Sequence, residues 1–209
     1  MPEVRTYTVY RIDELSEDAK DKAREWYRQY LFQDEIDWEF VYDYAVRAAE
    51  ILGIWIDTYF VCSRKRPKIW WSGFWHQGDG ACFEGYYYYA KDAPAKIREY
   101  APEDKELHRI ADELEKLQSQ HDFSLEARVR HTGRYYHSRS TTIEVFYGEP
   151  GNYVVEDIAE DVRTILRDFM DWIYDQLKKE YEYQCSDEHV DEVLRANDYT
   201  FDEHGNRED

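Results

Sequence analysis

The sequence predicts an α+β fold: an antiparallel sheet of about five to six strands, helices packed on one face and a long C-terminal helix. Strand-like stretches follow one another across short turns, which implies antiparallel pairing. Segments with apolar residues at helical spacing flank and interrupt these stretches. The 209 residues suit one domain, so we expect a single unit over 1–209 with a partly flexible tail at 196–209.

The first half of the chain alternates between strand and helix signals. Period-two alternation predicts strands over 5–12 and 54–60. Ser16 is a suitable N-cap for a first helix, and Gly53 is a suitable C-cap for a second that begins near Glu35. Two further strands, 68–75 and 81–89, are predicted on either side of a glycine-rich turn.

The second half repeats these signals. Short helices are expected near 94–102 and 107–117, and a strand pair over 123–130 and 141–147, with its turn at Gly133. The longest apolar stripe predicts a helix from Val155 to about Glu182. Ser186 then caps a last short helix.

Charge is distributed unevenly along the chain, whose net charge is −19. Residues 1–57 carry −7, residues 58–154 carry zero and residues 155–209 carry −12. Acidic ends repel a phosphate backbone, so composition disfavours direct nucleic-acid binding and favours a partner protein with a basic surface. No apolar run is long enough to span a membrane, and no signal peptide is evident. Three widely spaced cysteines favour a reducing cytoplasm.

The turn Gln77–Gly80 lies inside an aromatic and glycine-rich stretch, 70–85. Glycines let backbone N–H groups approach a ligand, and a carboxylate there can bind a cation or accept a proton. The residues expected to bind a ligand at this turn are Trp75, His76, Gln77, Asp79 and Glu84. The alternative is a plain hairpin turn whose polar side chains bond to their own backbone.

A basic segment, 128–139, contains four arginines and two histidines, with no acid from Ala127 to Thr142. Such a cluster suits phosphate or nucleic acid, and Arg130 and Arg134 are the residues expected to meet a phosphate. The alternative is that these arginines pair with the acidic helices of the same molecule.

A line of carboxylates follows the long C-terminal helix. At about 100° per residue its members fall within roughly 40° of a common line, over about 27 Å. The expected partner-binding residues are Asp157, Asp161, Asp168, Asp171 and Asp175. Spaced in this way they resemble DNA phosphates, although nearby arginines and lysines dilute the likeness. The alternative is a solvated helix face.

Signals for metals, cofactors and nucleophiles are weak, so we expect no metal, no cofactor and no assigned catalytic residue. Cys185 and His189 share a helical spacing, but no second pair with zinc-ligand spacing accompanies them. No motif of a nucleophilic serine or cysteine is present.

Several motifs resemble an uncharacterised family encoded by phages and prophages, sometimes labelled antitoxin-like. The most specific is Ser-Gly-Phe-x-x-Gln-Gly-Asp-Gly-Ala at 72–81, supported by segments at 15–20, 52–54 and 196–201. His76 departs from the small polar residue expected at its position, so it takes no role from the resemblance. The resemblance implies a phage accessory protein in the host cytoplasm, without an assigned activity.

These observations favour a binding protein over an enzyme. The first hypothesis is a phage-encoded acidic protein that modulates or inhibits a host nucleic-acid-handling or defence component, by DNA mimicry on its helical carboxylates. The second is a protein that binds or hydrolyses a small molecule or nucleotide at the Gln77–Gly80 turn. A virion-structural role finds no repeat or coiled coil to support it. The oligomeric state stays open.

Overall fold

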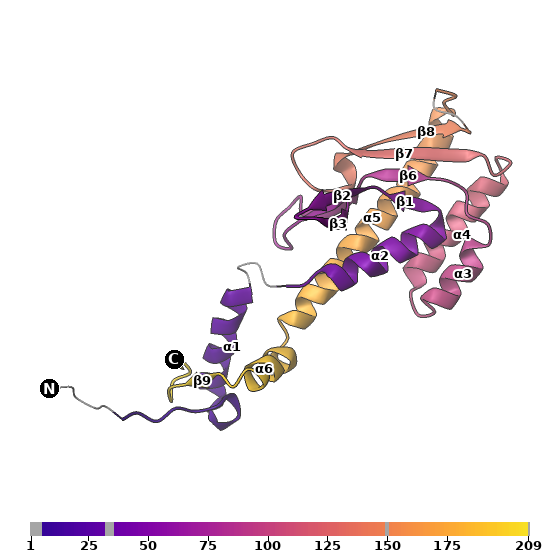
Figure 1. Ribbon diagram of the computed structural model, residues 1–209. Helices are drawn as coiled ribbons and strands as arrows, with labels where there is room; N and C mark the ends of the chain where they lie inside the picture. The colour runs from indigo at the N-terminus through magenta and orange to yellow at the C-terminus, as the bar shows by residue number, and fades with distance from the viewer. Residues whose placement is uncertain (1–5, 32–35, 149–150, 209) are drawn as a thin grey trace. The chain divides into compact units, whose positions relative to one another are not determined.

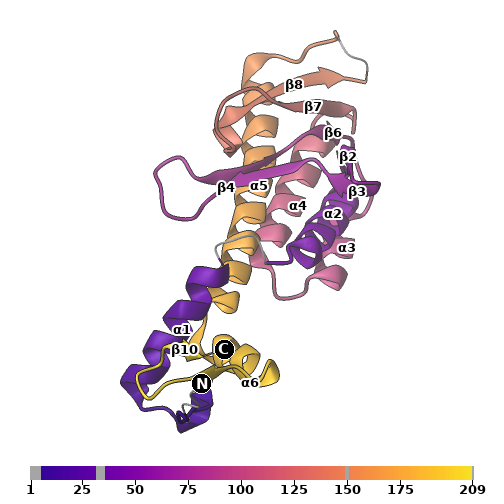
Figure 2. The ribbon, with the colours of Figure 1, turned by 60° about the vertical axis from the view of Figure 1, so that its left-hand side comes forward.

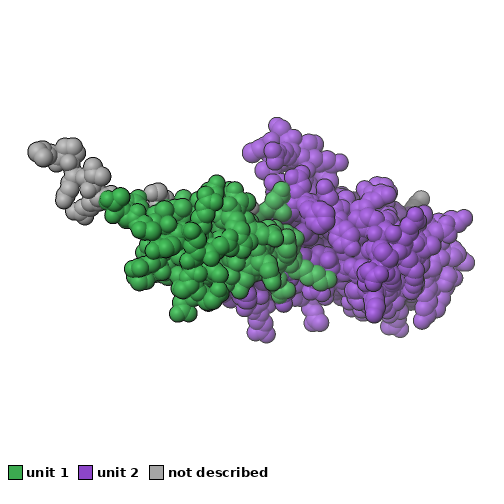
Figure 3. All heavy atoms as spheres, turned by 90° about the horizontal axis from the view of Figure 1, so that it is seen from below, with its two compact units in different colours: residues 1–37, 179–209 green, residues 38–178 purple. Residues whose placement is uncertain are grey.

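The computed structural model describes residues 6–31, 36–148 and 151–208, and it confirms the α+β class. The chain forms two compact units rather than the single domain expected. Unit 1 comprises residues 1–37 and 179–209, and unit 2 comprises residues 38–178 (Figure 3). The division has a physical basis, because the buried apolar residues form two separate clusters, one in each unit.

Unit 2 is built on a four-stranded antiparallel sheet with the order β1-β6-β7-β8 (Figure 1). Its strands are β1 (Ile54–Ile56), β6 (Gly85–Tyr87), β7 (Leu125–His131) and β8 (Thr141–Tyr147). Residues aligned across the sheet alternate between two faces. Ile54, Tyr87, Ala127 and Val145 form one buried row. The neighbouring row, Trp55, Tyr86, Arg128 and Glu144, is exposed or half-buried on the other face.

Helices cover the buried face of this sheet (Figure 1). They are α2 (Glu39–Leu52), α3 (Ala93–Tyr100), α4 (Lys105–Ser119) and α5 (Glu156–Gln184). The predicted long C-terminal helix is thus confirmed as α5, and Gly53 ends α2 at φ +83°, as its C-cap position requires. Gln118 of α4 is completely buried and donates a 3.1 Å hydrogen bond to the hydroxyl of Tyr87, which fixes helix to sheet.

Three two-stranded ladders meet at one point of unit 2. Two hairpins, one of β2 (Thr58–Val61) with β3 (Arg64–Pro67) and one of β4 (Ile69–Ser72) with β5 (Gly80–Phe83), join the β1–β6 ladder. Three backbone hydrogen bonds close a ring at the meeting point. Asp57 donates to Glu84, Glu84 to Lys68 and Lys68 to Asp57, at 2.8, 3.0 and 2.7 Å. Beyond this ring β2 and β3 form a two-stranded sheet of their own, and we call this hairpin the β2–β3 arm.

Unit 1 has its own small core. It contains η1 (Ile12–Glu14), α1 (Glu17–Leu31), α6 (Asp187–Ala196) and the short strands β9 (Thr200–Phe201) and β10 (Arg207–Glu208). One expectation fails here. The strand expected over 5–12 is a single bridge from Tyr10 to Phe201 in its described part. Within the tail at 196–209, which was expected to be partly flexible, Phe201 is completely buried and packs into this core.

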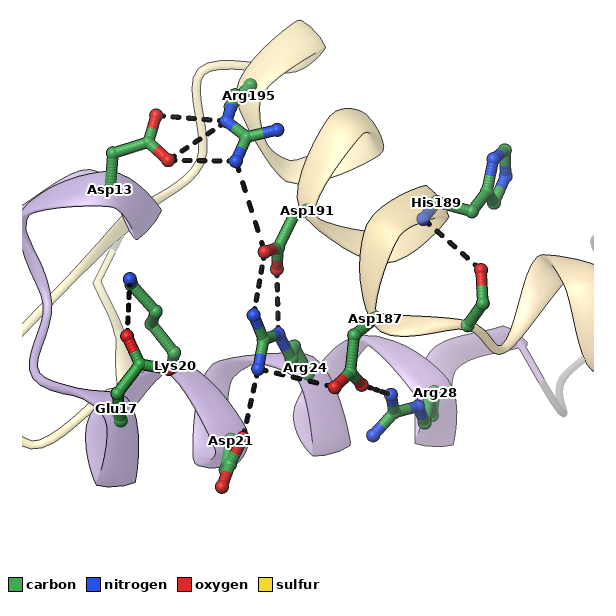
Figure 4. Close-up of polar contacts among 11 residues, drawn as sticks. Asp13, Glu17, Lys20, Asp21, Arg24, Arg28, Asp187, His189, Asp191 and Arg195 are labelled. Atoms are coloured by element: carbon green, nitrogen blue, oxygen red, sulfur yellow. Dashed lines mark hydrogen bonds and ion pairs between the residues drawn. The ribbon is translucent and has the colours of Figure 1, made fainter.

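Ion pairs connect the helices of unit 1 (Figure 4). The guanidinium of Arg24 on α1 reaches Asp191 on α6 at 2.7 Å, and both side chains are largely shielded from water. Arg28 contacts Asp187, and Arg195 binds Asp13 at 2.9 Å. The pKa of Arg24 is raised, chiefly by its hydrogen bonds to Asp191.

Candidate functional site

The Gln77–Gly80 turn is closed by its own aspartate. Asp79 Oδ2 accepts hydrogen bonds from the backbone N–H groups of Trp75 and His76, at 2.8 and 2.7 Å. These two bonds hold the pKa of Asp79 below its usual value, and the bond from His76 makes the larger contribution. Trp75, His76 and Gln77 are exposed, so the turn caps the β4–β5 hairpin at the edge of unit 2 (the loop beside β4 in Figure 2).

Glu84 lies at the junction of the three ladders rather than at this turn. Its carboxylate binds Lys68 Nζ at 2.8 Å, and Asp57 lies 3.7 Å from the same nitrogen. The Glu84 hydrogen bond is the main cause that raises the pKa of Lys68. The five residues expected at the turn therefore do not form one site. Glu84 stabilises the junction of the ladders, whereas Asp79 stabilises the turn.

The glycine-rich stretch around the turn instead packs against the basic segment. Residues 131–140, which include η2 (Ser138–Ser140), pack on the β4–β5 hairpin. A Cβ at Gly80 would lie 2.8 Å from Cδ2 of His137, so only glycine leaves room for that ring. On the other side Tyr174 of α5 donates a 3.0 Å hydrogen bond to the carbonyl of Gly73.

A series of aromatic rings links the hairpin arm to the basic segment. Ring centroids lie 5.0 Å apart for Tyr59 and Trp70, 5.9 Å for Trp70 and Tyr136, and 5.2 Å for Tyr136 and His131. Contacts of this kind stabilise by about 0.5–1.5 kcal/mol each beyond area burial. Because Tyr59 pairs across the ladder with Arg66, the rings hold the arginines of the arm and of the basic segment in one region of unit 2.

Arginines of the described chain divide into two groups, apart from Arg207, which lies over the rings of Trp26 and Tyr199. Nine form an ion pair with a carboxylate: Arg11, Arg24, Arg28, Arg47, Arg98, Arg109, Arg163, Arg167 and Arg195. Six form none with any described residue: Arg64, Arg66, Arg128, Arg130, Arg134 and Arg139. The basic segment is therefore not neutralised by the acidic helices, which was the alternative considered for it.

The outer face of the sheet adds exposed aromatic rings beside two of these arginines. Trp55 on β1 is 58% exposed, and it lies opposite Tyr86 in the ladder. Tyr86 stacks on Tyr88, with planes 17° apart, and the Arg128 guanidinium lies 5.6 Å from the centre of the Tyr86 ring. Arg130, two residues further along β7, is exposed. We call Trp55, Tyr86, Tyr88, Arg128 and Arg130 the outer-face cluster.

The carboxylates of α5 keep their common face, but their surroundings differ. Asp168 binds Arg109 of α4 at 2.7 Å, so its charge is compensated. Asp171 lies near η2 and is exposed. Partial desolvation of its carboxyl group raises the pKa of Asp171, and a hydrogen bond with Ser138 opposes this rise. Asp157, Asp161 and Asp175 are exposed and form no ion pair with described residues.

Other reactive groups do not assemble into a site within the part of the chain that the structure describes. No group of three His, Cys, Asp or Glu residues there has the geometry of a metal site. Burial raises the pKa of the Cys82 thiol to about 12, which keeps it protonated and unreactive at neutral pH. Nor does any helix of the described residues have the length and apolar character needed to cross a bilayer.

Sequence reasoning found the basic segment but missed the outer-face cluster. The signal was the run of four tyrosines at 86–89, in which alternate residues point to opposite faces of a strand. Tyr87 is buried, whereas its neighbours Tyr86 and Tyr88 lie on the outer face. Trp55 lies between Ile54 and Ile56 on a strand, so the same alternation places it on the face opposite to theirs. Its position on the outer face could therefore have been predicted.

Comparison with known proteins gives one match. No curated protein and no solved structure matches the chain. Residues 38–187 match a family described as a domain of unknown function, DUF8835, and this span includes all of unit 2. The chain belongs to the DUF8835 family.

Proposed function

We propose that this protein is a nucleic-acid-binding protein without catalytic activity, and that unit 2 carries the binding surface. The surface comprises the outer-face cluster and the six arginines that form no ion pair with a described residue. The single observation that carries the proposal is the division of the arginines. Arginine forms planar, charge-assisted hydrogen bonds to phosphate oxygens, so a group of unpaired guanidinium ions suits a phosphate backbone.

The unpaired state of these arginines needs a cause, because acids outnumber bases by 46 to 27. Most arginines of the chain find a carboxylate, even on exposed helix surfaces. Around β3 and the basic segment the sequence instead omits acids: none lies between Asp57 and Asp79 or between Glu126 and Glu144, the two acids that flank Arg128 on β7 and β8. Gathered cations repel one another, and a polyanion relieves that repulsion.

Net charge argued against this function at the level of composition, but surface charge acts locally. Screening limits interactions between exposed charges to about 8 Å at physiological salt. Unit 1 holds 9 lysines and arginines against 21 acids, so it carries −12 of the total of −19. Unit 2 carries the remaining −7, so the attraction for phosphate is local, at the places where its cations are gathered.

Binding without catalysis fits the chemistry of the nearby acids. Asp79 accepts two backbone hydrogen bonds within its turn, and Glu84 is paired with Lys68. A general base needs a free lone pair directed at substrate. Both carboxylates are already used to hold the fold.

The proposal is tested by fluorescence anisotropy with labelled oligonucleotides over a series of salt concentrations. We expect Arg64→Gln with Arg66→Gln to weaken binding and to lower the slope of log K against log salt by about one for each phosphate that is no longer bound. Arg47→Gln with Arg98→Gln is the matched control, since it removes the same charge from exposed, paired helix positions. Equal weakening in both variants, or no binding by the unaltered protein at low salt, would refute the proposal.

A second candidate function rests on the exposed carboxylates of α5. Asp157, Asp161 and Asp175 lie on one helix face without ion pairs among the described residues. In this proposal the chain is a phage-encoded DNA mimic that inhibits a host nucleic-acid-handling or defence protein. Charge reversal at these three positions should then abolish capture of a basic host protein from lysate, while Arg64→Gln with Arg66→Gln leaves capture intact. Capture that survives the reversal would exclude this function.

A further inference from the structure

Resting on the proposed function, we infer that the ligand is single-stranded and that its bases stack on the outer-face cluster. The inference comes from the aromatic members, Trp55, Tyr86 and Tyr88, rather than from the arginines. All three lie on the face of the sheet that the helices leave uncovered. Trp55 is the most exposed of the three, so it is the ring on which we expect a base to stack first.

The arrangement of the rings favours stacking. Trp55 and Tyr86 are direct neighbours across the ladder, and Tyr88 continues the row beyond the end of β6. Tyr86 and Tyr88 share a face because they are two positions apart on one strand, and their ring centroids lie 6.2 Å apart. The row thus places aromatic side chains on the outer face of an antiparallel sheet, and we call it the platform; aromatic side chains on such a sheet bind unpaired bases in known RNA-binding modules.

A duplex cannot use these rings in the same way. Its bases stack on one another, and only their edges reach the grooves. An unpaired strand presents both base faces, and stacking on aromatic side chains tolerates any sequence. Exposed tryptophan and tyrosine on the platform are therefore better used by a single strand.

Cations lie where the backbone of such a strand has to run. Arg128 is the cross-strand neighbour of Tyr86 and lies over its ring, and Arg130 follows on the same face of β7. The β2–β3 arm begins directly after β1 and carries Arg64, Lys65 and Arg66. Bases on the rings and phosphates on the arginines give one strand two kinds of contact.

An aromatic substitution separates this inference from the proposed function. Trp55→Ala is expected to weaken binding of labelled oligothymidylate by between about fivefold and more than a hundredfold, as removal of about 1–3 kcal/mol of stacking implies. The salt dependence should not change, because the arginines that bind phosphate remain in place. Trp55→Phe should restore most of the binding. Phe40→Ala, which removes an aromatic side chain 76% exposed on α2, is the matched control and should bind normally.

The same titrations use oligouridylate and a duplex of equal length. Tighter binding of both single strands than of the duplex supports the inference, and their ratio tells whether RNA or DNA is preferred. If the duplex binds as tightly as the single strands and Trp55→Ala has no effect, the inference is wrong, while loss of binding in the arginine variant keeps the proposed function. If no oligonucleotide binds at low salt, the proposed function itself fails.

Discussion

Arg24 and Arg66 are the same residue type with opposite surroundings. The Arg24 side chain is 11% exposed and binds Asp191, whose side chain is 13% exposed. Arg66 lies on the arm with no ion pair among the residues described. The first arginine stabilises unit 1, and the second is available to a ligand. The sequence alone did not distinguish a paired arginine from an unpaired one, because both positions have a charged neighbour in the chain. Only tertiary packing decides whether a carboxylate lies close enough to form an ion pair.

Removal of the shielded ion pair tests this distinction. Arg24→Ala leaves Asp191 without its main partner in a place with little water, which should lower the free energy of unfolding of unit 1 by about 3 kcal/mol. Denaturant unfolding, with amide hydrogen exchange to locate the destabilised segments in α1 and α6, measures the effect.

The control for this substitution is Arg47→Ala, which breaks the exposed pair with Glu50. It should cost less than about 1 kcal/mol, because solvent screens exposed pairs. Equal costs for the two variants would mean that shielding does not set the value of these contacts.

At the scale of elements, the regular segments followed from the sequence and the junctions did not. Apolar periodicity located α5 and the β7–β8 pair closely, because each is stabilised along its own length. The hairpin around the Gln77–Gly80 turn was also predicted, and Ser72 pairs with Gly80. The ring of hydrogen bonds at Asp57, Lys68 and Glu84 joins positions far apart in the chain, and no local pattern indicates it.

Gly85 tests the strand pairing that supports the platform. A Cβ there would lie 2.0 Å from the carbonyl oxygen of Trp55, so Gly85→Ala should force β1 and β6 apart and cost several kcal/mol. Gly148→Ala adds the same methyl group to open space and should cost only about 1–2 kcal/mol for its positive φ. Thermal unfolding compares the two, and a Gly85→Ala variant as stable as Gly148→Ala would contradict the tight pairing.

At the scale of the whole molecule, charge and family membership follow the two units. The DUF8835 match covers unit 2 entirely and includes only residues 179–187 of unit 1. Unit 1 holds most of the excess acid. Unit 2 holds Arg64, Arg66, Arg128, Arg130, Arg134 and Arg139, which form no ion pair with a described residue. The acidic ends of the chain were evident from the segment charges, whereas the gathering of these six arginines on unit 2 was not.

The most direct measurement of the central claim is NMR mapping of the labelled full-length chain during titration with oligothymidylate. The account predicts the largest changes in amide and arginine side-chain signals on β1, β3, β6, β7 and residues 131–140. Signals of Asp157, Asp161 and Asp175 should stay unchanged. Changes concentrated on those aspartates, or no change anywhere at low salt, would contradict it.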